Sequence, residues 1–196
     1  MNSDAIQTLV SERIEQNIVV SRSLLQDARY LATVAEAGMA LVHCLQSGHK
    51  VLFFGNGGSA ADAQHLAAEL TGRFLKDRPP LPGMALTTNT SALSAIGNDY
   101  SFDQVFARQL QGLGSEGDVA FGISTSGNAR NVLCAMEMAR QKKLLRVALT
   151  GSTGGKLANA VDHCIRVPSE TTPRIQEAHI LTGHILCEIV ERELFE

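Results

Sequence analysis

One basic and one acidic side chain near the middle of the chain have the spacing of a catalytic or metal-binding pair. His65 and Glu69 are four residues apart in an alanine-rich segment that favours helix, so both side chains lie on one helical face. An imidazole and a carboxylate placed in this way can exchange protons with a substrate or hold a metal ion. A single histidine is more often an ordinary surface or core residue, so the pairing with Glu69 carries the prediction.

A glycine-rich turn precedes this pair. The apolar run 50–54 predicts a buried strand, and Gly55-Asn56-Gly57-Gly58 then predicts a sharp turn before the helix. Backbone N–H groups at such a strand–turn–helix junction bind anions, most often phosphate. The same turn loosely fits a dinucleotide-binding pattern, but Asp77, at the required distance, precedes a proline-rich connection instead of ending a second strand. A nicotinamide cofactor is therefore not expected.

A second candidate phosphate site is the run Ser124-Thr125-Ser126-Gly127-Asn128, which follows an apolar strand. Hydroxyl groups and the free N–H groups of a helix beginning near Asn128 suit phosphoryl oxygens. An ordinary helix cap needs one such residue and this run has four, which favours phosphate binding over capping. The turn 150–156 resembles a P-loop only superficially, because Leu157 follows Lys156, and we interpret it as a connecting loop.

These motifs belong to a chain in which strands and helices alternate. That alternation predicts an α/β fold of three layers, with a parallel sheet between helices. Strands are expected near 50–54, 84–87, 118–123, 145–149 and 162–167. Helices are expected near 58–73, 91–97, 102–113, 128–141 and 173–193, after two helices between Asp4 and Ser47. Such a helical N-terminus exceeds what one sheet needs, so oligomerisation is as plausible a role for it as core packing.

The composition excludes several classes of partner. A length of 196 residues fits one domain, and a net charge of −3 predicts no basic surface for nucleic acid. No apolar run approaches the roughly 20 residues that span a bilayer, and no secretory signal is expected at the N-terminus. The four cysteines form no CxxC pair and predict reduced thiols in a cytoplasmic protein.

Five motifs stand in one order along the chain: Gly55–Ser59, His65-x-x-x-Glu69, Gly97–Asp99, Ser124–Asn128 and Arg174–Glu177. This series resembles the bacterial phosphoheptose isomerases of the SIS (sugar isomerase) domain superfamily. The resemblance implies a single SIS domain over 1–196, in which a five-stranded parallel sheet lies between helices. Residues 1–47 would form a helical arm used in oligomerisation, and residues 48–196 a sugar-phosphate-binding core.

The resemblance also implies an activity and an assembly. Family members are cytoplasmic homotetramers that convert D-sedoheptulose 7-phosphate to D-glycero-D-manno-heptose 7-phosphate through an enediolate. The product enters ADP- or GDP-heptose synthesis for lipopolysaccharide or capsule, and many members bind one zinc ion per subunit. No nucleic acid or membrane is implied as a partner.

Matched position by position, the family motifs assign roles to residues of this chain. The implied substrate contacts are Asn56, Gly57, Gly58, Glu69, Asn98, Asp99, Ser124, Thr125, Ser126 and Gln176. The implied zinc ligands are His65, Glu69, Gln176 and His184, and the implied catalytic groups are Glu69 and His184. Ala129 stands where the family often has a phosphate-binding serine, a loss of about 0.5–1.5 kcal/mol that leaves the phosphate site in place.

Two questions about this site stay open from the residues alone. Glu69 could act as the base or as a metal ligand, and firm binding to zinc would weaken it as a base. Gln176 and His184 are eight residues apart on an expected helix, or roughly 12 Å along its axis. Two side chains so far apart do not easily reach one ion, so we hypothesise that a neighbouring copy supplies one of them at a subunit interface.

The alternative from another class is a non-catalytic SIS protein that acts by protein binding, of the type that associates with the DnaA initiator. A protein of that kind has no need of His65, Glu69 and His184 together, and this chain has all three. The isomerase is therefore the leading hypothesis.

Overall fold

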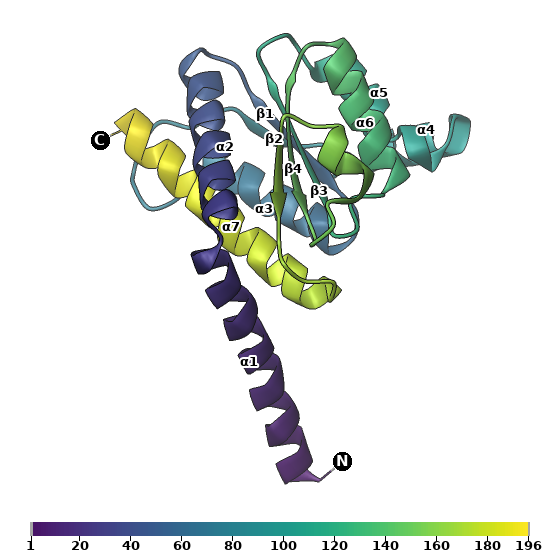
Figure 1. The fold of residues 1–196 in the computed structure, drawn as a ribbon. Coiled ribbons are helices and arrows are strands. Elements are labelled where there is room, and N and C mark those ends of the chain that lie inside the picture. Colours follow the sequence, from purple (N-terminus) through teal and green to yellow (C-terminus); the bar gives the residue numbers. More distant parts are fainter. Residues whose placement is uncertain (1, 196) are drawn as a thin grey trace.

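A five-stranded parallel sheet forms the centre of the protein in a computed structural model that describes residues 2–195 (Figure 1). The strands lie in the order β2-β1-β3-β4-β5, and all four pairings are parallel. Their bounds are β1 Val51–Gly55, β2 Gly83–Ala85, β3 Val119–Ser124, β4 Leu145–Thr150 and β5 His163–Arg166. Both β1 and β3 are buried along their whole length, as expected for strands that are covered on both faces.

Helices cover both faces of this sheet and complete three layers (Figure 1). The α-helices are α1 Ser3–Gln26, α2 Ala28–Gln46, α3 Gly58–Thr71, α4 Thr90–Asp99, α5 Ala107–Leu113, α6 Arg130–Gln141 and α7 Thr172–Phe195. Two short 3₁₀ helices, η1 Phe102–Gln104 and η2 Gly155–Asn159, lie in the connections. The predicted α/β fold with a five-stranded parallel sheet is confirmed.

The strands divide their side chains between two hydrophobic cores because successive residues point to opposite faces. Phe53 belongs to the core shared with α2, α3 and α7, and its ring lies 5.2 Å from that of Phe121. Phe54 belongs to the core shared with α5 and α6, and its ring lies 5.6 Å from that of Phe106. Helices α3 and α7 therefore share one face of the sheet, which becomes important for the candidate site.

Two of the expected helices differ from the structure. The helix expected over 102–113 is divided into η1 and α5, and the side-chain amide of Gln109 donates to the carbonyl oxygen of Val105 where the two segments meet. The helix expected from about Asn128 begins at Arg130. Its start is delayed because Gly127, with φ +64°, forms a turn whose N–H donates to the carbonyl oxygen of Ser124.

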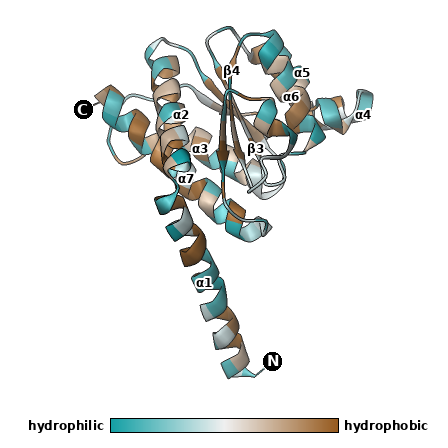
Figure 2. Ribbon diagram, viewed as in Figure 1, coloured by the Kyte–Doolittle hydropathy of each residue, from teal (hydrophilic) through white to brown (hydrophobic). Residues whose placement is uncertain are grey.

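Helix α1 forms an arm, most of which lies outside the two cores, whereas α2 packs into the core that contains Phe53. Asp27 separates α1 from α2 and caps α2, because its side chain accepts hydrogen bonds from the N–H groups of Arg29 and Tyr30. Helix α1 projects from the body (Figure 1), and hydrophobic residues recur along its length (Figure 2). Its exposed large apolar residues are Ile6, Leu9, Val10, Ile14, Val19 and Leu25. Among residues 2–195, no helix combines the length and apolarity that crossing a membrane requires.

Candidate active site

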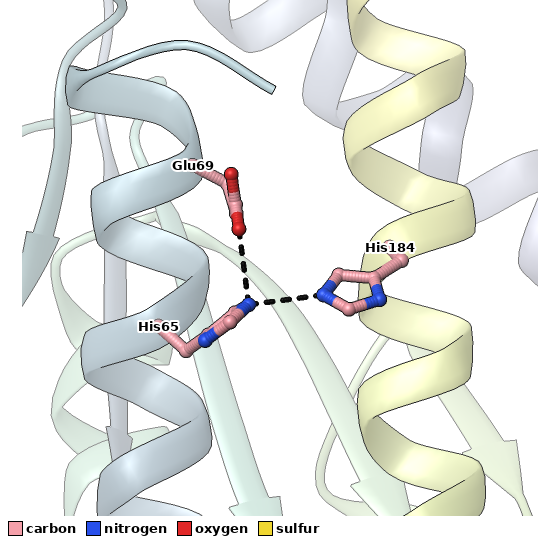
Figure 3. A group of neighbouring side chains, drawn as sticks. All are labelled: His65, Glu69 and His184. Carbon is pink, nitrogen blue, oxygen red and sulfur yellow. Dashed lines mark hydrogen bonds and ion pairs between the residues drawn. The ribbon is translucent and has the colours of Figure 1, made fainter. Parts of the chain in front are cut away.

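Three side chains from two helices converge at one point on the face of the sheet that α3 and α7 cover (Figure 3). His65 and Glu69 come from α3, and His184 comes from α7. Nε2 of His65 lies 3.0 Å from Oε1 of Glu69 and 3.0 Å from Nε2 of His184. The structure therefore brings together three of the four predicted zinc ligands within one chain.

Two groups of this cluster compete for one nitrogen, Nε2 of His65, which offers a single hydrogen or a single lone pair. If Nε2 of His65 carries a hydrogen, that one hydrogen cannot point at both Glu69 and His184. A cation between the three groups would satisfy all of them, and zinc bonds of about 2.0–2.2 Å would separate tetrahedral ligand atoms by roughly 3.3 Å. The donor atoms lie within 4.8 Å of one another, so the cluster fits a zinc ion after small side-chain adjustments.

The surroundings of the cluster leave it open to a ligand. The side chains of His65 and Glu69 are 48% and 22% exposed, so a substrate can reach them directly. The ring of Phe74 lies 5.5 Å from the ring of His184 and covers part of it. Within the described residues, no second group of three histidine, cysteine or acidic side chains meets the same geometric condition.

Gln176, the fourth predicted ligand, lies two turns closer to the start of α7 than His184 does. Its side chain rests on Gly58, where a Cβ would overlap with Nε2 of the amide. The eight residues from Gln176 to His184 correspond to about 12 Å along α7. Because His184 reaches His65 within one chain, the geometry does not require a neighbouring copy to supply it. Donation across subunits stays a prediction for Gln176.

Asp62 lies beside the cluster and was not singled out from the sequence. It lies on α3 three residues before His65, and its Oδ2 atom is buried without a hydrogen-bond partner. Burial raises the pKa of this carboxyl to about 6, although the nearby His65 acts in the opposite direction. The signal for it was present, because residues three apart on a helix share a face.

The predicted phosphate loop follows β3, at the carboxyl end of the sheet. Ser124 is buried at the end of the strand, and the hydroxyl of Ser126 accepts a hydrogen bond from the N–H of Asn128 at 3.2 Å. Helix α6 then begins after Ala129, whose side chain makes no capping bond. The N–H of Val132 donates to Oδ1 of Asn131, whereas the N–H groups of Arg130 and Asn131 receive no capping bond from Ala129 and are available to an anion.

A cavity of about 300 Å³ opens beside this loop. Hydroxyl, amide and acidic side chains from three segments line it, and its lining residues are Thr125, Ser126, Asn128, Gly151, Ser152, Thr153, Ser169, Glu170, Thr172 and Ile175. The turn 150–156, interpreted from sequence as a connecting loop only, thus contributes Ser152 and Thr153 to the cavity. Its position could have been inferred, since β3 and β4 are adjacent parallel strands whose carboxyl ends meet at one edge.

The glycine turn after β1 lies next to the start of α6. The side-chain amides of Asn56 and Asn131 exchange two hydrogen bonds, of 2.9 and 2.8 Å. Gly57 adopts φ +56°, a conformation that favours glycine, directly before the first residue of α3. Asn56 therefore joins the two predicted substrate loops. No sequence pattern identified Asn131 as its partner.

Asn98 and Asp99 lie apart from the cluster. They end α4, which packs against the core on the other face of the sheet from α3 and α7 (Figure 1). The amide of Asn98 donates to Oδ1 of Asp99 at 2.9 Å, and both residues are exposed. A single chain does not bring these two predicted substrate contacts to His65 and His184.

Comparisons with known proteins identify the family to which this fold belongs. The SIS domain family model matches residues 12–151. A phosphoheptose isomerase of Aneurinibacillus thermoaerophilus is 50% identical over 186 residues, which cover 95% of this chain and 94% of that protein. A phosphoheptose isomerase of Rhodospirillum rubrum is 60% identical over 161 residues, which cover 82% of this chain and 86% of that protein.

A solved structure gives the same result. The phosphoheptose isomerase of Neisseria gonorrhoeae superposes with a TM-score of 0.90 at 43% identity, covering 95% of this chain and 99% of that one. Sequence similarity at this level over nearly the whole length shows a shared family as well as a shared fold. The chain belongs to the phosphoheptose isomerase family of SIS domain proteins.

Proposed function

We propose that this protein is an isomerase that interconverts D-sedoheptulose 7-phosphate and D-glycero-D-manno-heptose 7-phosphate. The observation that carries the proposal is the convergence of His65, Glu69 and His184 in a chain of the phosphoheptose isomerase family. These groups can move protons at a carbonyl, which is the reaction that ketose–aldose isomerisation requires. A protein that only binds partners has no use for them.

The phosphate of the substrate binds in the cavity beside Ser124–Asn128. Thr125, Ser126 and Ser152 offer hydroxyl groups there, and the N–H groups of Arg130 and Asn131 at the start of α6 add further donors. Ile175 of α7 lines this cavity and His184 lies nine residues further along the helix, or about 13 Å along its axis. Helix α7 therefore extends from the phosphate end of an extended sugar to its reacting end.

Glu69 acts as the base. It removes a proton from C1 of the ketose, the electrons of that C–H bond form the C1–C2 double bond, and His184 protonates the oxygen on C2. Glu69 then delivers its proton to C2 while His184 takes the proton of the C1 hydroxyl, which leaves the aldehyde of the aldose. Oε1 of Glu69 faces His65, so its other oxygen stays available for the transferred proton.

A zinc ion is the proposed cofactor. His65, Glu69 and His184 would hold it, and Gln176 is the predicted fourth ligand. When bound, zinc would polarise the substrate carbonyl and stabilise negative charge that develops on oxygen, in place of the proton that His184 otherwise donates, because the His184 nitrogen that holds zinc cannot carry a proton as well.

The active form is proposed to be a cytoplasmic homotetramer with its sites at subunit interfaces, serving heptose synthesis for lipopolysaccharide or capsule. The exposed apolar residues of α1 support association, because helical surface of this kind needs a partner. The half-exposed His65, and the separation of Asn98 and Asp99 from it, are consistent with a second subunit completing each site.

An assay with sedoheptulose 7-phosphate tests this function. We expect turnover by the zinc-loaded protein, its loss with a chelator and its recovery with added zinc. A folded, zinc-supplied protein without turnover would overturn the isomerase and favour the protein-binding alternative. Activity that survives complete chelation would overturn the zinc proposal alone.

Mixed oligomers test which residues come from a neighbouring subunit. A Glu69→Ala chain mixed with a His184→Ala chain is expected to stay inactive, because one chain supplies both groups. A Glu69→Ala chain mixed with a Gln176→Ala chain recovers activity if Gln176 acts across the interface. No recovery by assembled mixtures of the second kind contradicts that donation.

A further inference from the structure

We propose that the buried Arg78–Glu191 ion pair positions the zinc-binding cluster by holding the end of α3 against α7. The inference rests on the proposed zinc site, and it assigns the two residues a positioning role without contact with the substrate. Arg78 and Glu191 lie outside the cluster, and their side chains are only 1% and 2% exposed. Buried charges are expensive, so a pair of this kind needs a full set of partners.

Glu191 receives four hydrogen bonds from the loop that follows α3. Its Oε1 accepts from the N–H of Phe74 at 2.8 Å and from Nε of Arg78 at 3.0 Å. Its Oε2 accepts from the N–H of Leu75 at 2.8 Å and from that of Lys76 at 3.0 Å. Burial alone would raise the pKa of Glu191, but these donors together lower it below its usual value. The loop is thus wrapped around a carboxylate that belongs to α7.

Arg78 connects this carboxylate to the last turn of α3. Its Nη2 donates to the carbonyl oxygen of Glu69 at 2.7 Å, and its Nη1 donates to that of Leu70 at 2.8 Å. Helix α3 ends at Thr71, so these carbonyl groups belong to the turn in which a helix runs out of its own N–H partners. The guanidinium therefore links the backbone of a cluster residue, Glu69, directly to Glu191.

The same carboxylate also acts on His184. Glu191 lies seven residues, or two turns, after His184 on α7, so both occupy one face of that helix. By fixing the N–H of Phe74, it holds the Phe74 ring 5.5 Å from the ring of His184. The ion pair thus reaches two of the three cluster residues: Glu69 on α3 through Arg78, and His184 on α7 through Phe74.

Isosteric replacement of the carboxylate tests the proposal. Glu191→Gln keeps the size of the side chain but presents an amide NH₂ group to N–H donors, which loosens the loop. In the folded variant we expect zinc affinity, measured by competition with a chelator, to fall about 10-fold or more. The visible absorption spectrum of the Co²⁺-loaded protein should change as well.

Asp118→Asn is the matched control. Asp118 is an equally buried carboxylate with several N–H partners, but it lies at the amino ends of the strands, away from the cluster. This variant should lose thermal stability yet keep zinc affinity within about 2-fold. Glu191→Gln with the zinc affinity and Co²⁺ spectrum of the wild type, or an equal zinc defect in Asp118→Asn, would overturn the proposal.

A metal-free measurement separates this inference from the proposed function. The imidazole proton shifts of His184, observed by NMR in protein without metal, report the position of the Phe74 ring. Relative to the wild type, these chemical shifts should change in Glu191→Gln and remain the same in Asp118→Asn, whether or not the wild type binds zinc. If Glu191→Gln does not fold, Arg78→Lys replaces it, because lysine keeps the charge but cannot reach Glu191 and the carbonyl groups of α3 together. Unchanged His184 shifts in the folded variant would overturn the proposal.

Discussion

Asp118 and Glu69 are carboxylates in two regions of one fold, and their partners differ. Asp118 lies directly before β3, is 1% exposed, and accepts hydrogen bonds from the N–H groups of Lys50 and Ser115 and from Nζ of Lys50. Glu69 is 22% exposed, and its side chain has His65 as its partner among the described residues. The first carboxylate is satisfied by the fold, whereas the second keeps an oxygen available for a ligand or a proton.

This difference separates a stabilising charge from a reactive one. A buried carboxylate with several donors holds its neighbours in place and gains nothing from a further ligand. A carboxylate beside two imidazoles, with too few hydrogens between them, gains from a cation or a substrate proton. Substitutions in the two regions should therefore affect different properties of the protein.

The largest expected effect is that of Glu69→Gln on catalysis. Removing the base should lower kcat by about 10²–10⁴-fold. The thermal midpoint should stay close to that of the wild type, since the Glu69 side chain is partly exposed. Glu188→Gln, which changes an exposed carboxylate paired with Arg192 on α7, is the control. A large loss of stability in Glu69→Gln would mean that both regions of the comparison are structural.

Asp118→Asn should lower stability and leave catalysis unchanged, the opposite of Glu69→Gln. Its loss of charge-assisted hydrogen bonds should lower the free energy of unfolding by about 2–3 kcal/mol, as measured by urea denaturation. The kcat of the folded variant should stay at the wild-type value. A fall in kcat at a temperature where the variant is fully folded would contradict the separation of the two regions.

Asp118 should also contribute to the pH dependence of the free energy of unfolding. Burial alone would raise the pKa of Asp118, but hydrogen bonds from Lys50 and Ser115 lower it below its usual value. Its contribution is therefore complete above the unfolded pKa of about 3.9 and is lost as the pH falls through the lower, folded value. Urea unfolding between pH 5 and pH 2 should show a shallower acid decline for Asp118→Asn than for the wild type. Parallel curves would show that other groups cause the decline.

The smallest expected effect comes from restoring a donor near the phosphate cavity. Ala129→Ser adds a hydroxyl at the N-cap of α6, next to the N–H groups of Arg130 and Asn131. One further hydrogen bond, worth about 0.5–1.5 kcal/mol, should lower KM by roughly 2- to 10-fold and leave kcat unchanged. Ala129→Val, which adds bulk without a donor, is the control. An equal fall in KM in both variants would exclude the hydroxyl as the cause.

Much of the fold could be predicted because its signals are local. The apolar runs and glycine turns located all five strands to within a few residues, and the spacing of His65 and Glu69 placed them on one helical face. The pairing of Asn56 with Asn131 could not be predicted, because it joins residues 75 positions apart through two amides that follow no pattern. The ion pair of Arg78 with Glu191 also joins distant parts of the sequence. It could not be predicted because charged side chains usually face solvent, whereas these two are buried.

Gly58 has a consequence for how this chain can change over time. The Gln176 side chain occupies the space that a Cβ at position 58 would need, so the two positions share one small volume. A Cβ at position 58 requires the flexible end of the Gln176 side chain to move, although the two positions are 118 apart in the sequence. A homologue with alanine at position 58 should therefore hold residue 176 in another rotamer or carry a shorter side chain there. The side-chain position of residue 176, and with it the shape of the site, is thus tied to the absence of a Cβ at position 58.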